Sequence, residues 1–201
     1  MDRSISGRSR LVSAWLLAAG MCLLVLGLAG FARSGLRQDA LKRGWAERPT
    51  LPAGETAGSD LGRPAASAIA EGQPVARIRI PRVGLDAVVL EGISDATLAQ
   101  APGHYPGMAL PGEGGHVVLA AHRDSFFKDL GKLEDGDAVT LTRRDGREVS
   151  YRVSRSYIVH KTNRTVIVPV DHEVLTLITC YPFQYVGHAP YRYIVEAVPA
   201  S

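Results

Sequence analysis

Three residues carry side chains suited to nucleophilic catalysis, and each falls at the end of a predicted strand. Cys180 follows the β-branched and apolar run 174–179 and precedes Pro182, which cannot donate a ladder hydrogen bond, so we expect the thiol at the rim of a sheet. His122 ends one further apolar run, and Arg192 opens another. Because strands hold the backbone of rim residues in place, we expect these side chains to face one groove.

Together these groups suit acyl transfer. A cysteine thiolate is a strong nucleophile toward an acyl carbon. His122 can accept a proton and later deliver it to a leaving amine, since an imidazole changes its charge near neutral pH. Arg192 is a permanent cation, so it can hold the oxyanion of a tetrahedral intermediate or a substrate carbonyl. Taken singly, each residue also has a simpler explanation: an inert core cysteine, a histidine at a sheet rim and a solvated arginine.

The elements that must position these residues are short strands. An Asp145-Gly146 turn joins two of them as a hairpin, and Ser94 and Asp124 or Ser125 could cap short helices. Seven or eight short strands with so little helix predict an all-β fold, a closed or nearly closed β-barrel. The apolar pattern predicts strands at 75–80, 85–90, 117–121, 138–142, 148–159, 165–168, 174–179 and 191–198, helices at 94–100 and 126–130, and loops at 101–107 and 111–115.

The N-terminal residues predict a membrane anchor. Residues 1–10 are polar and basic, whereas residues 11–32 contain no charged side chain. That run matches the roughly 20 residues that a helix needs to cross a bilayer. We therefore expect a short cytoplasmic N-terminus at 1–10 and an uncleaved transmembrane helix at 11–32. The small residues Gly30 and Ala32 leave a cleaved signal peptide open as the alternative.

A stalk and linker are expected at 33–74, between the anchor and the folded domain. A short helix is predicted at 34–47, and Pro49 stops it. The chain that follows is rich in Pro, Gly, Ala, Ser and Thr, which is typical of a linker. The folded domain is then expected at 75–199.

Charge and cysteine content narrow the classes of function. The net charge of +3 is modest and the sequence has no basic patch interleaved with aromatic residues, so we expect no nucleic-acid partner. Cys22 lies in the apolar N-terminal run, which leaves Cys180 alone in the domain without a disulfide partner. A zinc site formed by His116, His122 and Cys180 is conceivable, but no short-spaced pair of Cys or His supports it.

Two segments together resemble a known family. The sequence TLITC at 176–180, with the flanks CYPF and APYRY, resembles the signature of the sortases, the cysteine transpeptidases of bacterial surfaces. The AHRD segment at 121–124 resembles the histidine segment of the same family. The likeness covers about residues 75–198, and the flanks are most similar to the single-pass membrane sortases of Gram-negative proteobacteria.

The resemblance implies a fold and a reaction. The fold is a closed eight-stranded sortase-type β-barrel with one or two short helices, preceded by the transmembrane helix. Cys180 is then the nucleophile, His122 the general acid and base, and Arg192 the clamp on substrate and oxyanion, with no cofactor and no metal. The implied enzyme is a cysteine transpeptidase, a thiol peptidase that cleaves an LPxTG-like C-terminal sorting signal after its Thr. A thioacyl intermediate forms on Cys180 and is transferred to an amine.

The same resemblance implies partners and a location. The partners are a substrate protein with that sorting signal, an amine acceptor that could be related to peptidoglycan, and the membrane through residues 11–32. The location is the bacterial inner (cytoplasmic) membrane, with the catalytic domain on the periplasmic side. Two alternatives stay open: a thiol hydrolase that releases its product to water, and an anchored, non-catalytic peptide-binding barrel in which Cys180 is buried.

Overall fold

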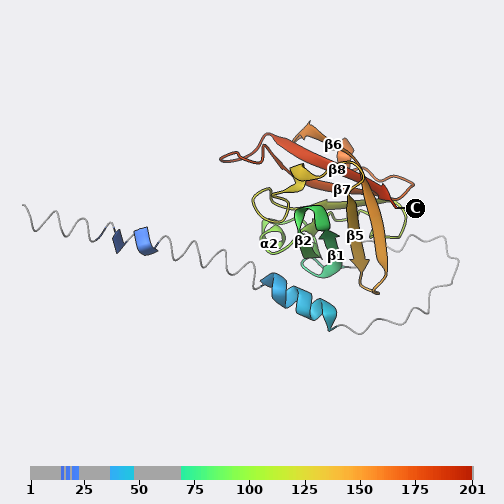
Figure 1. The fold of residues 1–201 in the computed structure, drawn as a ribbon, viewed down its shortest axis with the longest axis horizontal. Helices are drawn as coiled ribbons and strands as arrows, with labels where there is room; N and C mark the ends of the chain where they lie inside the picture. Colours follow the sequence, from blue (N-terminus) through green and yellow to red (C-terminus); the bar gives the residue numbers. More distant parts are fainter. Residues whose placement is uncertain (1–14, 16, 19, 23–36, 48–68, 201) are drawn as a thin grey trace, which may run out of the picture. The chain divides into compact units, whose positions relative to one another are not determined.

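The computed structural model describes residues 15, 17–18, 20–22, 37–47 and 69–200 (Figure 1). The chain divides into two compact units, residues 1–39 and 40–201. Among the described residues, no helix is both long enough and apolar enough to cross a bilayer. The predicted anchor and linker lie mostly outside the described residues, so both stay predictions.

A helix at 37–46 confirms the short helix predicted at 34–47. Within the second unit, its residues Leu41 and Trp45 pack against a small apolar cluster that includes the fully buried Val88. Apolar burial of this kind is the main source of stability for a helix too short to persist alone.

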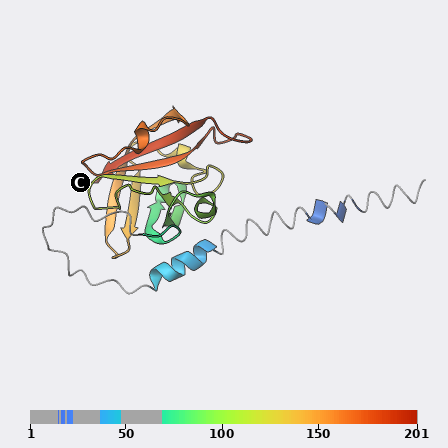
Figure 2. The ribbon, with the colours of Figure 1, turned by 180° about the vertical axis from the view of Figure 1, so that it is seen from behind.

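Eight strands form a closed barrel in the order β1-β2-β3-β4-β7-β8-β6-β5, which confirms the predicted all-β barrel. Neighbouring strands are antiparallel except for the pairs β2 with β3 and β4 with β7. Figures 1 and 2 show β7 and β8 side by side, next to β6. The strands are β1 (Pro74–Ile80), β2 (Leu85–Glu91), β3 (Gly103–His104), β4 (His116–Ala120), β5 (Ala138–Arg143), β6 (Glu148–His160), β7 (Val174–Tyr181) and β8 (Tyr191–Pro199).

The barrel interior is filled by alternate residues of each strand, because successive side chains of a strand point to opposite faces. In β7 the inward residues are Leu175 and Leu177, and in β8 they are Val195 and Ala197; all are fully buried in the main core. Tyr151 of β6 is also in this core, and its burial raises the pKa of its hydroxyl, as does the hydrogen bond that it donates to a carboxylate. The even-numbered residues of β7 and β8 therefore face outward.

Helix content is as low as predicted, although one helix was placed wrongly. The α-helix α2 (Asp95–Leu98) confirms the short helix expected at 94–100, with the Ser94 hydroxyl accepting a hydrogen bond from the Thr97 N–H at 3.3 Å. The helix predicted at 126–130 was wrong: these residues form turns that lead into the 3-10 helix η3 (Leu130–Lys132). Phe127 and Leu130 are buried there, so apolar burial shapes the segment without a helical ladder.

Two further local predictions were wrong. The loop predicted at 101–107 contains β3, which pairs with both β2 and β4. A strand of two residues has no periodicity to recognise, and a side chain at Gly103 would place its Cβ 2.2 Å from the Gly92 carbonyl oxygen. The strand predicted at 165–168 is instead the 3-10 helix η4 (Thr165–Ile167). Its β-branched residues have no neighbouring strand to pair with in the described chain, and pairing is what stabilises a strand.

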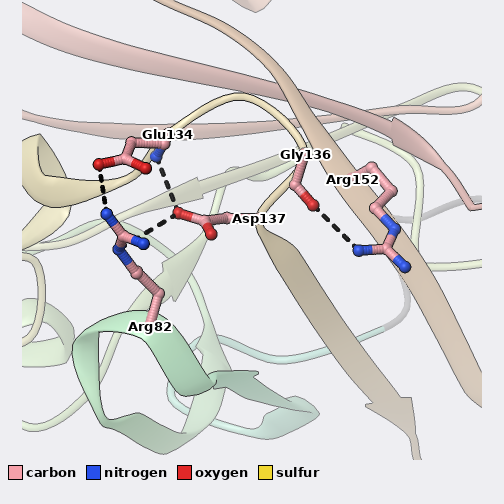
Figure 3. A network of polar contacts seen from close by, with 5 residues as sticks. All are labelled: Arg82, Glu134, Gly136, Asp137 and Arg152. Atoms are coloured by element: carbon pink, nitrogen blue, oxygen red, sulfur yellow. Dashed lines mark hydrogen bonds and ion pairs between the residues drawn. The ribbon is translucent and has the colours of Figure 1, made fainter.

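The turn before β5 is held by a polar network from a distant part of the chain (Figure 3). Arg82, in the 3-10 helix η2 (Pro81–Val83), contacts the carboxylates of Glu134 and Asp137. Asp137 also accepts a hydrogen bond from the Glu134 N–H at 2.8 Å, and Arg152 of β6 donates to the Gly136 carbonyl at 3.0 Å. Arg82 and Glu134 are exposed and only Asp137 is partly buried, so the network orients the turn more than it stabilises the domain.

Candidate active site

Cys180 and Arg192 are directly opposite each other in the β7–β8 ladder. Antiparallel partners in this position have Cα atoms about 4.5 to 5.5 Å apart. Both residues are even-numbered members of strands whose odd-numbered residues fill the core, so their side chains leave the barrel on the same outer face. Cys180 is half-buried and forms no disulfide, so its thiol is free and partly accessible on this face. β7 continues through Cys180 to Tyr181, two residues beyond the predicted strand end.

His122 reaches the same face through the parallel pairing of β4 with β7. The last register pair is Ala120 with Ile178, and His122 and Cys180 each lie two residues further along. The pairing extends past the end of β4, because the Ala121 N–H donates to the Ile178 carbonyl at 3.2 Å and the Thr179 hydroxyl donates to the Ala121 carbonyl at 2.8 Å. The imidazole and the thiol are therefore neighbours across two strands.

The three predicted residues line a single surface cleft of about 370 Å³. The structure thus brings together an imidazole, a thiol and a guanidinium that are distant in sequence. The rest of the lining comes from α2, the segment after β4, the end of β6 and the β7–β8 connection: Asp95, Arg123, Asp124, Lys161, Gly187, His188 and Ala189. Cys180 lines this cleft and is only half-buried, which contradicts the alternative of a barrel with a buried thiol.

The guanidinium of Arg192 is anchored at one nitrogen only. Its Nη1 donates to the carbonyl oxygens of Ala189 at 3.3 Å and Tyr191 at 3.0 Å. Among the described residues, Nε and Nη2 have no hydrogen-bond partner. These two donors are the ones that a bound carbonyl or oxyanion can use.

A second cavity of about 410 Å³ lies on the same outer face, four residues before Cys180 along β7 and four residues after Arg192 along β8. Thr176 of β7 and Glu196 of β8 are register partners on its floor, and the β6–β7 connection supplies Val166, Val168 and Val170. Burial raises the pKa of Glu196, but hydrogen bonds from Arg155 and Tyr157 outweigh this and leave that pKa below its usual range.

His116 is also at this second cavity, and its position removes the zinc alternative. Its Nδ1 is 2.6 Å from the Val168 carbonyl oxygen and its Nε2 is 2.7 Å from the Thr176 hydroxyl, so both ring nitrogens are already hydrogen-bonded. His116 is the first residue of β4 and His122 lies two residues past its last, so the two imidazoles are at opposite ends of this strand and cannot share one ion with Cys180.

Glu173 is the last residue of the β6–β7 connection, and its carboxylate holds that end of the connection against the barrel. One carboxylate oxygen accepts hydrogen bonds from the Gly112 N–H at 2.8 Å and the Tyr151 hydroxyl at 2.5 Å, and the other accepts from the Gly114 N–H at 3.3 Å. The connection that walls the second cavity is therefore tied to the β3–β4 loop.

Sequence reasoning did not identify several residues that line the cleft, notably Asp95, Arg123, Lys161 and His188. Only Arg123 had a signal, because it follows His122 directly in the AHRD segment. Asp95, Lys161 and His188 belong to segments whose approach to Cys180 depends on barrel closure and leaves no local pattern.

A model of the sortase domain matches residues 78–200. The chain belongs to the sortase family. Sortases are cysteine transpeptidases, and their chemistry needs a cysteine. In this chain, the cleft holds the thiol of Cys180 together with an imidazole and a guanidinium.

Relatives within the family include enzymes of the sortase D and sortase C types. The chain is 34% identical to sortase D of Bacillus subtilis over 194 residues, which is 92% of this chain and 96% of that one. It is 36% identical to the catalytic domain of SrtD from B. anthracis, with a TM-score of 0.58 over 73% of this chain and 97% of that one. It is 30% identical to a Clostridium perfringens sortase C solved with its C-terminal cell wall sorting motif, with a TM-score of 0.60 over 67% of this chain and 74% of that one.

Proposed function

We propose that this sortase cleaves an LPxTG-like C-terminal sorting signal after its Thr and transfers the acyl group to an amine. The observation that carries the proposal is the convergence of Cys180, His122 and Arg192 on one cleft. Cys180 would be the nucleophile, His122 the general acid and base, and Arg192 the clamp on the substrate carbonyl and its oxyanion.

In the proposed mechanism, each proton transfer and the stabilisation of the oxyanion are assigned to a named residue. His122 takes the proton of the Cys180 thiol, and the sulfur attacks the Thr carbonyl carbon. A C–S bond forms as the carbonyl π electrons move to the oxygen, and Nε and Nη2 of Arg192 donate to the developing oxyanion. His122 gives a proton to the leaving nitrogen, and the peptide C–N bond breaks. The acceptor amine then loses a proton to His122 and attacks the thioester. A new C–N bond forms, the C–S bond breaks, and Cys180 is regenerated.

The outer face of β7 suits an extended peptide as the acyl donor. Thr176 in the second cavity and Cys180 in the cleft are four residues apart on one face, which is about 13 Å at the 3.3 Å rise of a strand. A sorting motif of LPxTG length, held extended beside β7, spans that interval. The C. perfringens sortase C solved with its cell wall sorting motif supports the same class of substrate.

We further propose that residues 11–32 anchor the enzyme in the bacterial inner membrane as a single span, with the catalytic domain on the periplasmic side. The uncharged run and the linker composition of 33–74 support this arrangement. A tether raises the effective concentration of enzyme and substrate that share one membrane. The narrower likeness to sortases of Gram-negative proteobacteria and a peptidoglycan-related acceptor stay predictions.

The test uses the full-length chain with a library of LPxTG-type peptides and a primary amine. We expect an acyl thioester at Cys180 by mass spectrometry and a peptide-amine product, both absent from a Cys180→Ala variant that melts like the wild type. Release of peptide acid alone would identify a thiol hydrolase. A reactive Cys180 that forms no thioester with any peptide would overturn the proposal.

A further inference from the structure

The β7–β8 connection, residues 182–190, forms one wall of the catalytic cleft. Gly187, His188 and Ala189 line the cleft beside Cys180. The tip of this connection buries little surface, because Val186 is 99% exposed and Tyr185 is 45% exposed. A segment with so few buried contacts needs polar contacts to hold one position.

Arg123, in the segment after β4, supplies those polar contacts. Its Nη2 donates to the carbonyl oxygens of Tyr185 at 2.6 Å and Gly187 at 3.0 Å, and its guanidinium carbon lies 5.9 Å from the centroid of the Tyr185 ring. In the part of the chain that the structure describes, no other hydrogen bond reaches residues 183–188.

Both ends of the connection are fixed independently of Arg123. At its start, the Phe183 ring packs against Tyr181, with ring centroids 5.7 Å apart. At its end, the Lys161 N–H donates to the Pro190 carbonyl at 2.9 Å, and the Ala189 carbonyl accepts from Arg192. Loss of the Arg123 contacts therefore frees the middle of the connection while its ends stay in place.

We propose that Arg123 is a positioning residue that holds residues 184–188 at the cleft beside Cys180 and thereby sets how often the thioacyl intermediate is transferred to an amine instead of being hydrolysed. This inference rests on the proposed function. Hydrolysis requires a water molecule to attack the thioester, so that a C–O bond forms and the C–S bond to Cys180 breaks. A closed wall restricts water at the thioester, and a released wall admits it.

The test compares Arg123→Ala with the wild-type full-length chain, using one LPxTG-type peptide and one fixed concentration of a primary amine. Mass spectrometry gives the ratio of hydrolysed to transferred product, which does not depend on the fraction of folded enzyme. We expect Arg123→Ala to raise this ratio at least about tenfold, because even one hydrogen bond from a charged group contributes about that factor or more. Lys128→Ala removes an exposed cation from the same segment and should keep the wild-type ratio.

A conservative variant separates positioning from simple charge. Arg123→Lys keeps a cation beside His122 but lacks the planar group that reaches two carbonyls and lies over the Tyr185 ring. Positioning predicts a raised ratio in Arg123→Lys, whereas a purely electrostatic role predicts the wild-type ratio and would overturn the proposal.

The reactivity of the thiol gives a second readout. Positioning predicts that iodoacetamide modifies Cys180 faster in Arg123→Ala, as measured by peptide mapping, with the pH profile of the reaction unchanged. A displaced pH profile with an unchanged product ratio would assign Arg123 an electrostatic role instead. A wild-type enzyme without a thioester would refute the proposed function, whereas a thioester-forming Arg123→Ala variant with the wild-type ratio would refute only the inference about Arg123.

Discussion

Replacing Arg192 by lysine tests the clamp role with the least disturbance to the fold. Nη1 of the guanidinium donates to the carbonyl oxygens of Ala189 and Tyr191, and in the proposed mechanism Nε and Nη2 donate to the substrate. A lysine has one ammonium group on a flexible stem. It can take the place of Nη1 or contact the oxyanion, but it cannot hold both positions.

The expected loss follows from the donors removed. Losing one donor to an oxyanion costs about 2.7 to 4 kcal/mol of barrier, or about 10² to 10³ in rate. Since Arg192→Lys keeps the positive charge beside Cys180, we expect a fall of about 10² in the rate of thioester formation, at the lower end of that range.

A single-turnover assay measures this step. The full-length enzyme is mixed in excess with an LPxTG-type peptide, quenched in acid, and the thioester at Cys180 is quantified by mass spectrometry. Arg152→Lys is the matched control, because Arg152 is an exposed β6 residue that donates to the Gly136 carbonyl at 3.0 Å, outside the cleft (Figure 3). A wild-type rate for Arg192→Lys, with both variants folded, would refute the clamp.

Three further predictions concern acid-base chemistry, packing and pH. His122→Ala should lower both thioester formation and turnover by about 10² to 10⁴, because the proposed mechanism needs His122 in both steps, and unchanged turnover would remove His122 from the mechanism. Gly131→Ala places a Cβ 2.6 Å from the Phe183 ring, so urea denaturation should show a loss of about 1 to 3 kcal/mol; equal stability would mean that the ring moves freely. The hydrogen bond from Arg77 lowers the pKa of Asp86 despite partial burial. The ionised carboxylate therefore stabilises the fold above its ordinary pKa of about 3.9, and the stabilities of wild type and Asp86→Asn should converge as pH falls below that value.

The predicted strands show how far local pattern reaches. The apolar runs at 174–179 and 191–198 predicted β7 and β8 and placed Cys180 and Arg192 at the ends of these strands. The outward direction of both side chains follows from the core residues of the folded barrel, because a strand has a side-chain period of two. The AHRD segment at 121–124 also singled out His122 as a candidate site residue, and the structure places it in the cleft with Cys180. By contrast, β3 was missed because its two residues act only through their partners on either side, and the segment at 165–168 has β-branched residues but no strand to pair with.

The residue types of the candidate site and most of the strands that carry them were therefore readable from the chain alone, since both depend on side-chain chemistry and on short-range sequence pattern. Only the tertiary structure decided that β4 pairs in parallel with β7, which brings His122 beside Cys180, and that Arg123 reaches the carbonyl oxygens of Tyr185 and Gly187. These contacts join residues about sixty positions apart, and their formation depends on how the barrel closes. Periodicity says which way a side chain points, whereas the order of strands around the barrel determines what it meets.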